Sequence, residues 1–205
     1  MQINWKVSNN VWDYGDKYNM ADFRLNHEGT GMLFTERLIL RKFMISDTYD
    51  MYNNWAADKE VAKYTLWKVN ESISETRSIL EDWCMRYDSS QYYHWAIVFK
   101  ENKQVIGSIS ISGINNCLKT CNVGYTLGRG YWNMGIATEV LKAVINFMVN
   151  TVGIQKIYAY HDIQNPASGR VMQKCGMEFI KRKKKIFLSG NRPFIDCDYY
   201  CFSTK

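Results

Sequence analysis

A turn that carries several glycines separates a strand-like segment from a helix-like one, and it has the clearest potential for chemistry in this chain. Residues 122–127 have the composition of a strand, which Gly128 and Gly130 interrupt. Apolar residues then recur at helical spacing from Ile136 onward. The first N–H groups of such a helix have no partners within it and attract anions such as phosphate, and Gly135, without a Cβ, would let a phosphate approach the backbone. Taken alone, the segment fits a phosphate site and a plain glycine-shaped turn equally well.

A second segment, residues 165–176, has the features of a short helix with two defined ends. Pro166 favours extended dihedrals at Asn165, as an N-cap requires, and Pro166 itself suits the first helical position. Gly176 suits the position after the last helical residue. By itself this pattern favours a structural role, with Asn165 as the cap and Ser168 as a surface residue of the first turn.

Together the two segments resemble the acetyl-CoA-binding core of the GNAT acyltransferase superfamily, and more closely its Rim-type branch, which includes the ribosomal-protein N-terminal alanine acetyltransferases. Trp132 is common at its place in that branch, and Asn133 replaces a frequent glycine but tolerates left-handed dihedrals. The resemblance runs from about residue 33 to the C-terminus and is specific in the order and spacing of its segments. The further matching segments are Thr35-Glu-Arg-Leu-Ile-Leu-Arg41, Val105-Ile-Gly-Ser108, Val123-Gly-Tyr125 and Lys174-Cys-Gly176.

The resemblance implies transfer of an acetyl group from acetyl-CoA to an amine by direct attack in a ternary complex, without an acyl-enzyme. Backbone N–H groups of the strand that ends at Leu127 would align the pantetheine and polarise the thioester. The turn would hold the pyrophosphate. The implied catalytic residues are Ser168, as proton donor to the departing thiolate, and Asn165. The implied cofactor-binding residues are Tyr125, Thr126, Leu127, Trp132, Asn133, Met134, Gly135, Ile136, Ala137, Thr138, Asn165, Ser168 and Lys174.

The base that deprotonates the amine stays open. Family members often carry Glu where Asn122 stands, and an amide cannot serve as a base. His161, Asp162 and His94 are weak candidates, and a water molecule is the alternative. The acceptor is open as well: a protein N-terminus, a polyamine, an amino sugar and other small amines all fit.

The composition is that of one folded domain in the cytoplasm. The chain has 205 residues, of which 46% are hydrophobic and 15% aromatic. No apolar run approaches the ~20 residues that a membrane span needs, and the N-terminus lacks the apolar block of a signal peptide. The net charge of +6 suits a polyanionic cofactor. The basic run of residues 181–185 lies between strand-like residues, which favours a solvated edge strand over a nucleic-acid site.

The six cysteines indicate neither a metal site nor disulfides. The pairs Cys117/Cys121 and Cys197/Cys201 would each lie about 13 Å apart along a strand, too far to share a zinc ion without other ligands. Disulfides are rare in cytoplasmic proteins. Cys175 follows the late helix, where the helix dipole opposes thiolate formation, so it is predicted to be a packing residue.

The pattern predicts an α+β fold, GNAT-like, with a mostly antiparallel twisted sheet of about six to seven strands flanked by helices. The expected helices are 46–57 with Ser46 as cap, 74–87, one from Ile136, and 166–175. The expected strands are 33–43, 93–99, 104–114, 119–127, 154–161, 178–188 and 194–203, the last two forming a hairpin across 189–192.

The first 31 residues fit no part of the family pattern. They are either an N-terminal extension that packs on the domain or on a partner, or a segment upstream of a natural start at Met32. We lean toward the second, because the codons for residues 27–31 can contain a purine-rich ribosome-binding sequence. A single GNAT-like domain is predicted over residues 32–205. The aromatic residues of the first segment are Trp5, Trp12, Tyr14, Tyr18 and Phe23.

Two other classes of function stay open beside the enzyme. A non-catalytic acyl-CoA sensor would bind CoA without turnover, and a basic nucleic-acid-binding module, which the sequence disfavours, would bind with a steep dependence on salt. The expected partners are an amine acceptor and no membrane, with the protein a monomer or a homodimer. No metal is expected.

Overall fold

The computed structural model describes residues 24–65, 67–187 and 194–204. One eight-stranded sheet runs through this part of the chain in the order β1-β2-β3-β4-β5-β6-β8-β7. All neighbouring strands are antiparallel except β5 and β6, so the predicted α+β fold and mostly antiparallel sheet are confirmed. The strands are β1 (Leu33–Phe34), β2 (Leu38–Arg41), β3 (Tyr93–Phe99), β4 (Val105–Asn115), β5 (Thr120–Leu127), β6 (Lys156–Asp162), β7 (Glu178–Phe187) and β8 (Phe194–Ser203).

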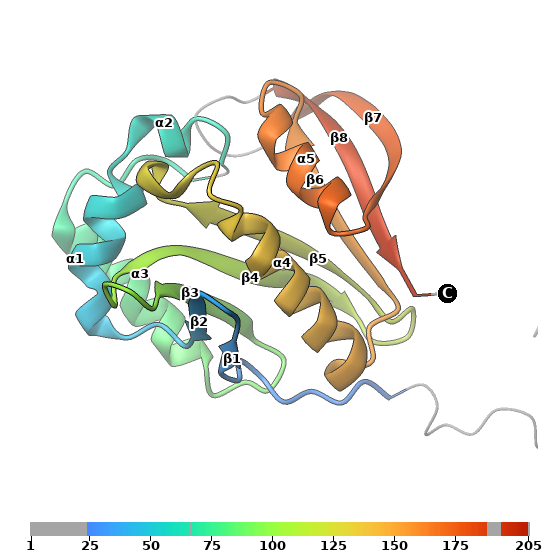
Figure 1. Cartoon of the computed structure of the whole chain (residues 1–205), viewed down its shortest axis with the longest axis horizontal. Coiled ribbons are helices and arrows are strands. Elements are labelled where there is room, and N and C mark those ends of the chain that lie inside the picture. Colours follow the sequence, from blue (N-terminus) through green and yellow to red (C-terminus); the bar gives the residue numbers. More distant parts are fainter. Residues whose placement is uncertain (1–23, 66, 188–193, 205) are drawn as a thin grey trace, which may run out of the picture.

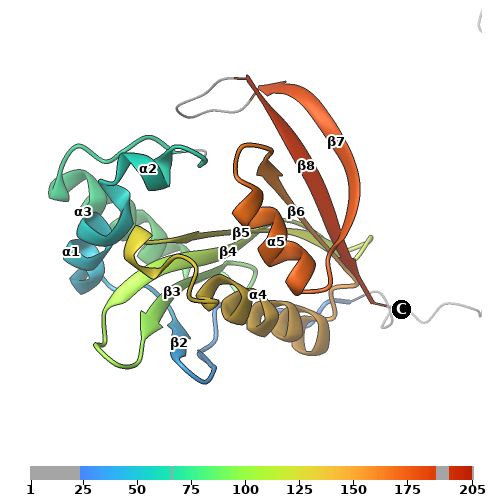
Figure 2. The same ribbon diagram turned by 45° about the horizontal axis from the view of Figure 1, so that its top comes forward.

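Helices cover both faces of this sheet, with α4 and α5 on one face and α1 and α3 on the other (Figures 1 and 2). Short 3₁₀ turns precede α1 and α4, and a π-helical turn follows each of the same two helices. The helices are α1 (Thr48–Met51), α2 (Lys59–Ala62), α3 (Ile73–Arg86), α4 (Ile136–Phe147) and α5 (Pro166–Lys174).

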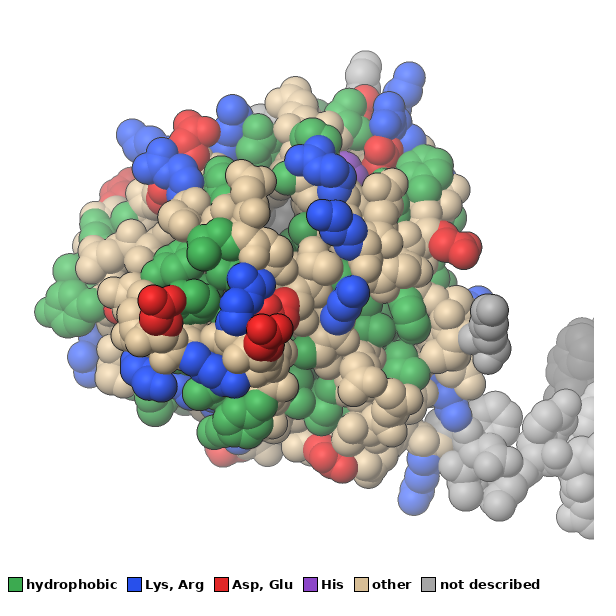
Figure 3. All heavy atoms as spheres, viewed as in Figure 1, with side chains coloured by type: hydrophobic (Ala, Val, Ile, Leu, Met, Phe, Trp, Pro, Cys, Tyr) green, Lys and Arg blue, Asp and Glu red, His purple; other side chains and the backbone are tan. Residues whose placement is uncertain are grey.

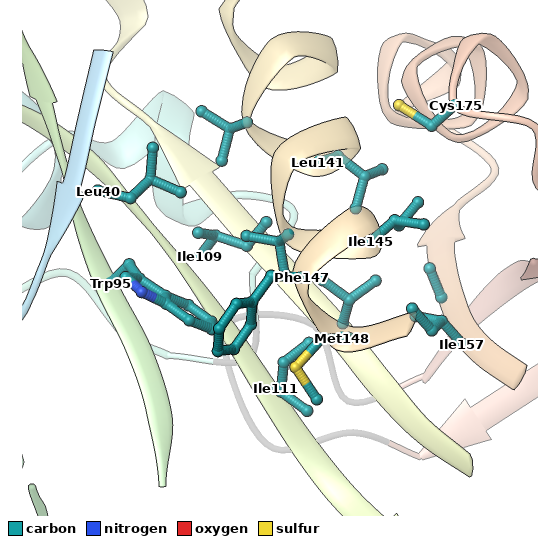
Figure 4. Packing of buried hydrophobic residues seen from close by; sticks show 14 of the residues in the cluster. Leu40, Trp95, Ile109, Ile111, Leu141, Ile145, Phe147, Met148, Ile157 and Cys175 are labelled. Carbon is teal, nitrogen blue, oxygen red and sulfur yellow. The ribbon is translucent and has the colours of Figure 1, made fainter. Parts of the chain in front are cut away.

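The two layers of core follow from the alternation of side chains along β3. Trp95 packs in the cluster that α4 and α5 share with the sheet, whereas Ala96, the next residue, packs with α1 and α3. Figure 4 shows Leu141 and Ile145 of α4 above the sheet, with Cys175 reaching the same cluster from α5. Burying one such large apolar side chain stabilises the fold by about 1.5–3 kcal/mol, so this packing fixes α4 and α5 over the sheet.

The parallel pair β5 and β6 separates along its length. Thr120, Cys121 and Asn122 pair with residues 156–158, and no later residue of β5 pairs with β6 in the described part of the chain. Beyond Asn122, therefore, β5 pairs only with β4. The two strands open toward their C-terminal ends, which places an opening beside the turn that leads to α4.

The chain just before Met32 is hydrogen-bonded to the sheet. The Thr30 hydroxyl donates to the carbonyl of Tyr92 at 2.9 Å and accepts the N–H of His94 at 3.0 Å. The indole Nε1–H of Trp95 donates to the carbonyl of Gly31 at 2.7 Å. These bonds join residues 30 and 31 to β3. The aromatic residues of the first 23 positions lie outside the described residues, as does the hairpin turn 189–192.

The first predicted helix is wrong in its form. Instead of one helix capped by Ser46, a 3₁₀ turn, the short α1 and a π-helical turn (Tyr52–Ala56) follow one another. The physical reason is Asp47, whose carboxylate accepts two hydrogen bonds from Arg41, at 2.7 and 2.8 Å, and one from the N–H of Met44 at 2.8 Å. These bonds hold the entry to the helix in a tight turn. Likewise, the expected strand 33–43 is divided into β1 and β2, and α2 was not predicted.

Two predictions about individual residues are confirmed. The basic run of residues 181–185 lies on β7, the edge strand of the sheet. Cys175 is buried, and burial raises the pKa of its thiol to about 11, so it is a packing residue and not a thiolate. Cys117, however, lies in the exposed turn between β4 and β5, so the assumed strand spacing between Cys117 and Cys121 is wrong.

Candidate active site

A cavity of about 780 Å³ occupies the opening between β5 and β6. Its volume is in the range of small-molecule sites. In Figure 3 the surface is hollowed between the turn before α4 and α5, with Lys and Arg side chains along the α5 side. Apart from Met134, every residue that the sequence predicted for the site lines it: Tyr125, Thr126, Leu127, Trp132, Asn133, Gly135, Ile136, Ala137, Thr138, Asn165, Ser168 and Lys174.

The turn before α4 presents an uncapped helix N-terminus to this cavity. Gly135 is the N-cap with φ of 76°, and no side chain caps the helix. The first hydrogen bond of the helix runs from the N–H of Glu139 to the carbonyl of Gly135, at 3.1 Å, so the N–H groups of residues 136–138 precede the helical ladder. Asn133 has φ of 61°, as its tolerance of left-handed dihedrals predicted. This geometry is suited to an anion.

A clamp from the start of the sheet holds this turn in place. The guanidinium of Arg37 donates to the carbonyl of Met134 at 2.9 Å and pairs with the carboxylate of Glu139 at 2.7 Å. The hydroxyl of Thr35 donates to the same carboxylate at 2.6 Å. Burial alone would raise the pKa of Glu139, but the hydrogen bonds from Thr35 and Arg37 outweigh it and hold the pKa below its usual range. The sequence signal for this clamp was an acidic residue in the first turn of a helix.

Trp132 also fixes the path of the turn. Its indole Nε1–H donates to the carbonyl of Leu127, the last residue of β5, at 2.9 Å. Trp132 also lines the cavity, and the residue is 40% exposed. The indole of Trp132 therefore links the end of the turn to the strand that precedes it, five residues earlier in the chain.

The N-terminus of α5 brings Ser168 to the opposite side of the cavity. The side chain of Asn165 caps the helix by accepting the N–H of Ser168 at 3.4 Å, so the predicted cap is confirmed. The hydroxyls of Ser168 and Tyr125 lie 2.9 Å apart, and the Tyr125 hydroxyl is also 3.1 Å from the Ser168 carbonyl. Burial raises the pKa of Tyr125 far above its ordinary value, more than the hydrogen bond to Ser168 lowers it, so the phenol stays protonated. Sequence reasoning missed this pair, because only the backbone of Tyr125 was expected to act.

A family model described as an acetyltransferase (GNAT) domain matches residues 37–178, which span β2 to the start of β7. The chain belongs to the GNAT acetyltransferase family. The match includes the turn before α4, the separating strands and α5, and the predicted resemblance is confirmed.

Individual relatives agree with this assignment. The GNAT domain is 27% identical to an uncharacterized N-acetyltransferase of Bacillus subtilis over 72% of this chain and 82% of the relative. It is 23% identical to the ribosomal protein uS5-alanine N-acetyltransferase of Escherichia coli over 55% of this chain and 69% of that enzyme. The solved structure of the microcin C7 self-immunity acetyltransferase MccE shares the fold with a TM-score of 0.74, at 20% identity over 83% of this chain and 94% of MccE. This chain is thus a GNAT N-acetyltransferase with Rim-type relatives.

The GNAT cavity has a polar, uncharged floor on the sheet. Ser108, Ser110 and Ser112 of β4 pair with alternate residues of β5 and line the cavity together with Asn122. The amide of Asn122 provides hydrogen bonds but no base.

Two of the side chains considered as bases, His94 and Asp162, are buried and already hydrogen-bonded. The Nδ1 of His94 lies 3.1 Å from the hydroxyl of Tyr92, and burial lowers the pKa of His94 to about 3, so it is a weak base at neutral pH. The carboxylate of Asp162, itself 4% exposed, accepts the N–H of Gln164 at 2.8 Å.

His161 lines the cavity and packs against α5. Its Nδ1 lies 2.7 Å from the carbonyl of Asp162, so this nitrogen carries the proton of the neutral ring. Its buried Nε2 has no hydrogen-bond partner among the described residues, and a Cβ added at Gly169 would lie 2.6 Å from it. Burial lowers the pKa of His161. Gly169 is therefore required for the approach of α5 to β6, and His161 supports α5.

Cations line the cavity on the α5 side. Lys174 was predicted, whereas Arg170 of the same helix was not; Lys63, which follows α2 and so lines the cavity from another element, was not predicted either. Among the described residues no three His, Cys, Asp or Glu side chains form a group that could hold a metal ion.

In the part of the chain that the structure describes, no helix has the length and apolar character to cross a bilayer.

Proposed function

We propose that this GNAT N-acetyltransferase transfers the acetyl group of acetyl-CoA to a primary amine by direct attack in a ternary complex. The observation that carries the proposal is one continuous cavity. It joins the uncapped N-terminus of α4, the cations of α5, the Ser168 hydroxyl and an open side that faces α1 to α3. The MccE structure, which has the same fold, contains acetyl-CoA and AMP.

The chain's own groups fit a polyanionic thioester substrate. The N–H groups that precede the ladder of α4 and the side chains of Arg170 and Lys174 favour phosphates. The residues of β5 that follow Asn122 pair only with β4, so this edge of β5 is placed to align an extended pantetheine chain through its backbone. These are the residues that would orient the acetyl group toward the amine.

Ser168 is placed to supply the proton that leaves with the thiol. The amine nitrogen forms its bond to the acetyl carbon, the carbon–sulfur bond breaks, and the thiolate takes up a proton. The Ser168 hydroxyl would donate this proton to sulfur and regain one from the water that takes up the amine proton, while the Tyr125 phenol, which stays protonated, holds Ser168 by a hydrogen bond across 2.9 Å. Asn165 positions Ser168 through the cap of α5.

Water is the proposed acceptor of the amine proton. Of the titratable groups considered, His94 is buried with a pKa of about 3, His161 faces Gly169, and Asp162 is buried and hydrogen-bonded. The serines and Asn122 on the floor of the cavity can order such a water molecule.

The test is a matched pair of variants at the N-cap of α4. Gly135→Asn and Gly135→Asp have the same shape and tolerate positive φ equally, and they differ by one negative charge. Acetyl-CoA affinity, measured by calorimetry, should fall by at least about 100-fold in the Asp variant relative to the Asn variant, because its carboxylate repels the pyrophosphate at close range. Equal affinities in two folded variants would place the pyrophosphate elsewhere.

The same titration separates the alternatives. A non-catalytic sensor would bind acetyl-CoA but release no free thiol with any amine. A nucleic-acid-binding module would bind RNA or DNA with a steep dependence on salt and would not respond to acetyl-CoA. Thiol release with an amine, together with sensitivity to the charge at position 135, supports the enzyme alone.

A further inference from the structure

The open side of the cavity is apolar where it meets the helices that cover the other face of the sheet. We call this part the acceptor arm. It is lined by Met51, Trp55, Val61, Trp67, Ile79 and Trp83. Trp55, Met51 and Val61 are buried, and Trp67 and Trp83 are half-buried. The arm therefore continues from the cavity into the interior beside α1 and α3.

The aromatic rings of the arm are held in fixed positions by their neighbours. Phe43 lies 5.1 Å from Trp83 and 6.5 Å from Trp55, measured between ring centroids. His94, neutral because burial keeps its pKa low, lies 4.1 Å from Trp83. The arm is thus a preformed surface that would contact a flat or aliphatic group and remove its apolar area from water.

The acceptor arm has no carboxylate for a second positive charge. The charged residues that line the whole cavity, among the described residues, are Lys63, Arg170, Lys174 and Asp162. Asp162 is buried at the end of β6 and already accepts a hydrogen bond from the N–H of Gln164. Of these four residues, Lys63, which follows α2, is the closest in sequence to the arm. An ammonium group placed there would lose its water and gain no partner, which is costly.

We infer that the acceptor is a primary monoamine with an apolar or aromatic group next to its amine and no second positive charge, bound with that group in the arm of Trp55, Trp67 and Trp83. This inference rests on the proposed function. It excludes polyamines and amino sugars with several amines, which the sequence left open. The polar floor of Ser110, Ser112 and Asn122 would then face the amine and its polar neighbours.

Hexylamine and 1,5-diaminopentane make a matched test, because they have the same length and differ only in a terminal methyl or ammonium group. We expect kcat/KM, measured as CoA thiol release at saturating acetyl-CoA, to favour hexylamine by at least about 100-fold, since a desolvated and unpaired ammonium loses several kcal/mol in comparison with a methyl group. Equal or better use of the diamine would overturn the inference while leaving the proposed function intact. No thiol release with any amine would overturn the proposed function and the inference with it.

A pair of charge reversals tests whether the preference for the monoamine arises at the cavity. Lys63→Glu places a carboxylate at the cavity, whereas Lys59→Glu makes the same change on α2 at an exposed position that does not line it. Lys63→Glu should raise the use of the diamine relative to hexylamine by about 2- to 5-fold, the range for a solvated ion pair, and Lys59→Glu should leave this ratio unchanged.

Trp67→Ala should lower kcat/KM for hexylamine by roughly 10-fold and leave acetyl-CoA affinity unchanged. An unchanged ratio in Lys63→Glu and unchanged kcat/KM in Trp67→Ala would together place the acceptor outside the arm.

Discussion

At the turn before α4 the groups available to a ligand are backbone N–H groups, whereas in the acceptor arm they are side chains. The turn is a contiguous stretch, residues 133–138, whose path depends on two positive φ angles and on the clamp of Arg37 and Glu139. The arm collects side chains from α1, α2, α3 and the loops between them. A ligand common to a family can be held by backbone, because the backbone N–H is the same in every sequence, and a ligand particular to one member has to be recognised by side chains.

Asn133 illustrates the difference. It stands where relatives often have glycine, yet it adopts φ of 61° and the turn keeps its form. In contrast, replacing one Trp of the arm by a carboxylate would change the chemistry of the arm entirely. The turn thus depends on its backbone conformation more than on the side chain at position 133, whereas the arm depends on its side chains.

Ser168 lines the cavity that joins the turn before α4 to the acceptor arm, and removal of its hydroxyl should have the largest effect on turnover. Ser168→Ala should lower kcat by roughly 10- to 10³-fold, because the departing thiolate loses its proton donor, while acetyl-CoA affinity stays within a few-fold. The control is Ser74→Ala, an exposed serine in the first turn of α3. Tyr125→Phe removes the partner of Ser168 but not the donor, so its kcat should fall less. Wild-type turnover of a folded Ser168→Ala variant, in an assay limited by chemistry, would leave Ser168 with a structural role only.

The acceptor side should be the acid-sensitive side, because His94 is buried there as a neutral ring. Its pKa is about 3 in the folded protein against 6.5 in the unfolded chain, so the unfolded chain binds the proton as pH falls below 6.5. The stability due to this group is complete above pH 6.5 and is lost toward pH 3. Relative to a His94→Gln variant, the wild type should lose roughly 2–3 kcal/mol of unfolding free energy by pH 4.5, measured by urea denaturation. Identical pH profiles would show that His94 takes up a proton as readily in the folded protein as in the unfolded chain.

Thr30 tests whether the segment before Met32 supports the same side of the sheet. Thr30→Val should cost about 1–3 kcal/mol of unfolding free energy, since it leaves the buried N–H of His94 without its acceptor. Thr204→Val, whose hydroxyl makes a long bond of 3.4 Å near the surface, should cost less than about 0.5 kcal/mol. If the two variants are equally stable, residues 30 and 31 are dispensable. Intact-mass analysis of the native protein then decides between starts at Met1 and Met32.

Asn165 gives the smallest expected change and tests the α5 side by itself. Asn165→Ala should lower the unfolding free energy by about 1 kcal/mol through loss of the N-cap, whereas Asn165→Asp keeps a capping oxygen and should be neutral within a few tenths. Thermal unfolding of the two variants measures the difference. A stable Ala variant with low kcat would show that Asn165 acts on the chemistry and not through the cap.

The sequence predicted what depends on local pattern. Pro166 and Gly176 defined α5, the apolar spacing from Ile136 defined α4, and strand-like composition defined most strands. The α1 region was wrong because Asp47 binds Arg41, a side-chain contact that propensity does not encode.

At the site, the residues of the turn and of α5 could be predicted because they are contiguous and the family pattern covers them. The pairing of Tyr125 with Ser168, the clamp of Arg37 with Glu139 and the aromatic arm join residues far apart in sequence. Their proximity depends on how far β5 and β6 separate and on where α3 packs, which no local pattern specifies.

The central claim is that both substrates occupy one cavity and that the acetyl group passes directly between them. Initial rates of thiol release, measured over a grid of acetyl-CoA and hexylamine concentrations, test it most directly, with mass spectrometry of the protein after incubation with acetyl-CoA alone. We expect intersecting reciprocal plots and no acetyl group on Cys175 or on any other cysteine, since the Cys175 thiol is buried with a raised pKa. Parallel plots, together with a stoichiometric acetyl-enzyme that transfers its acetyl group to the amine, would contradict the account.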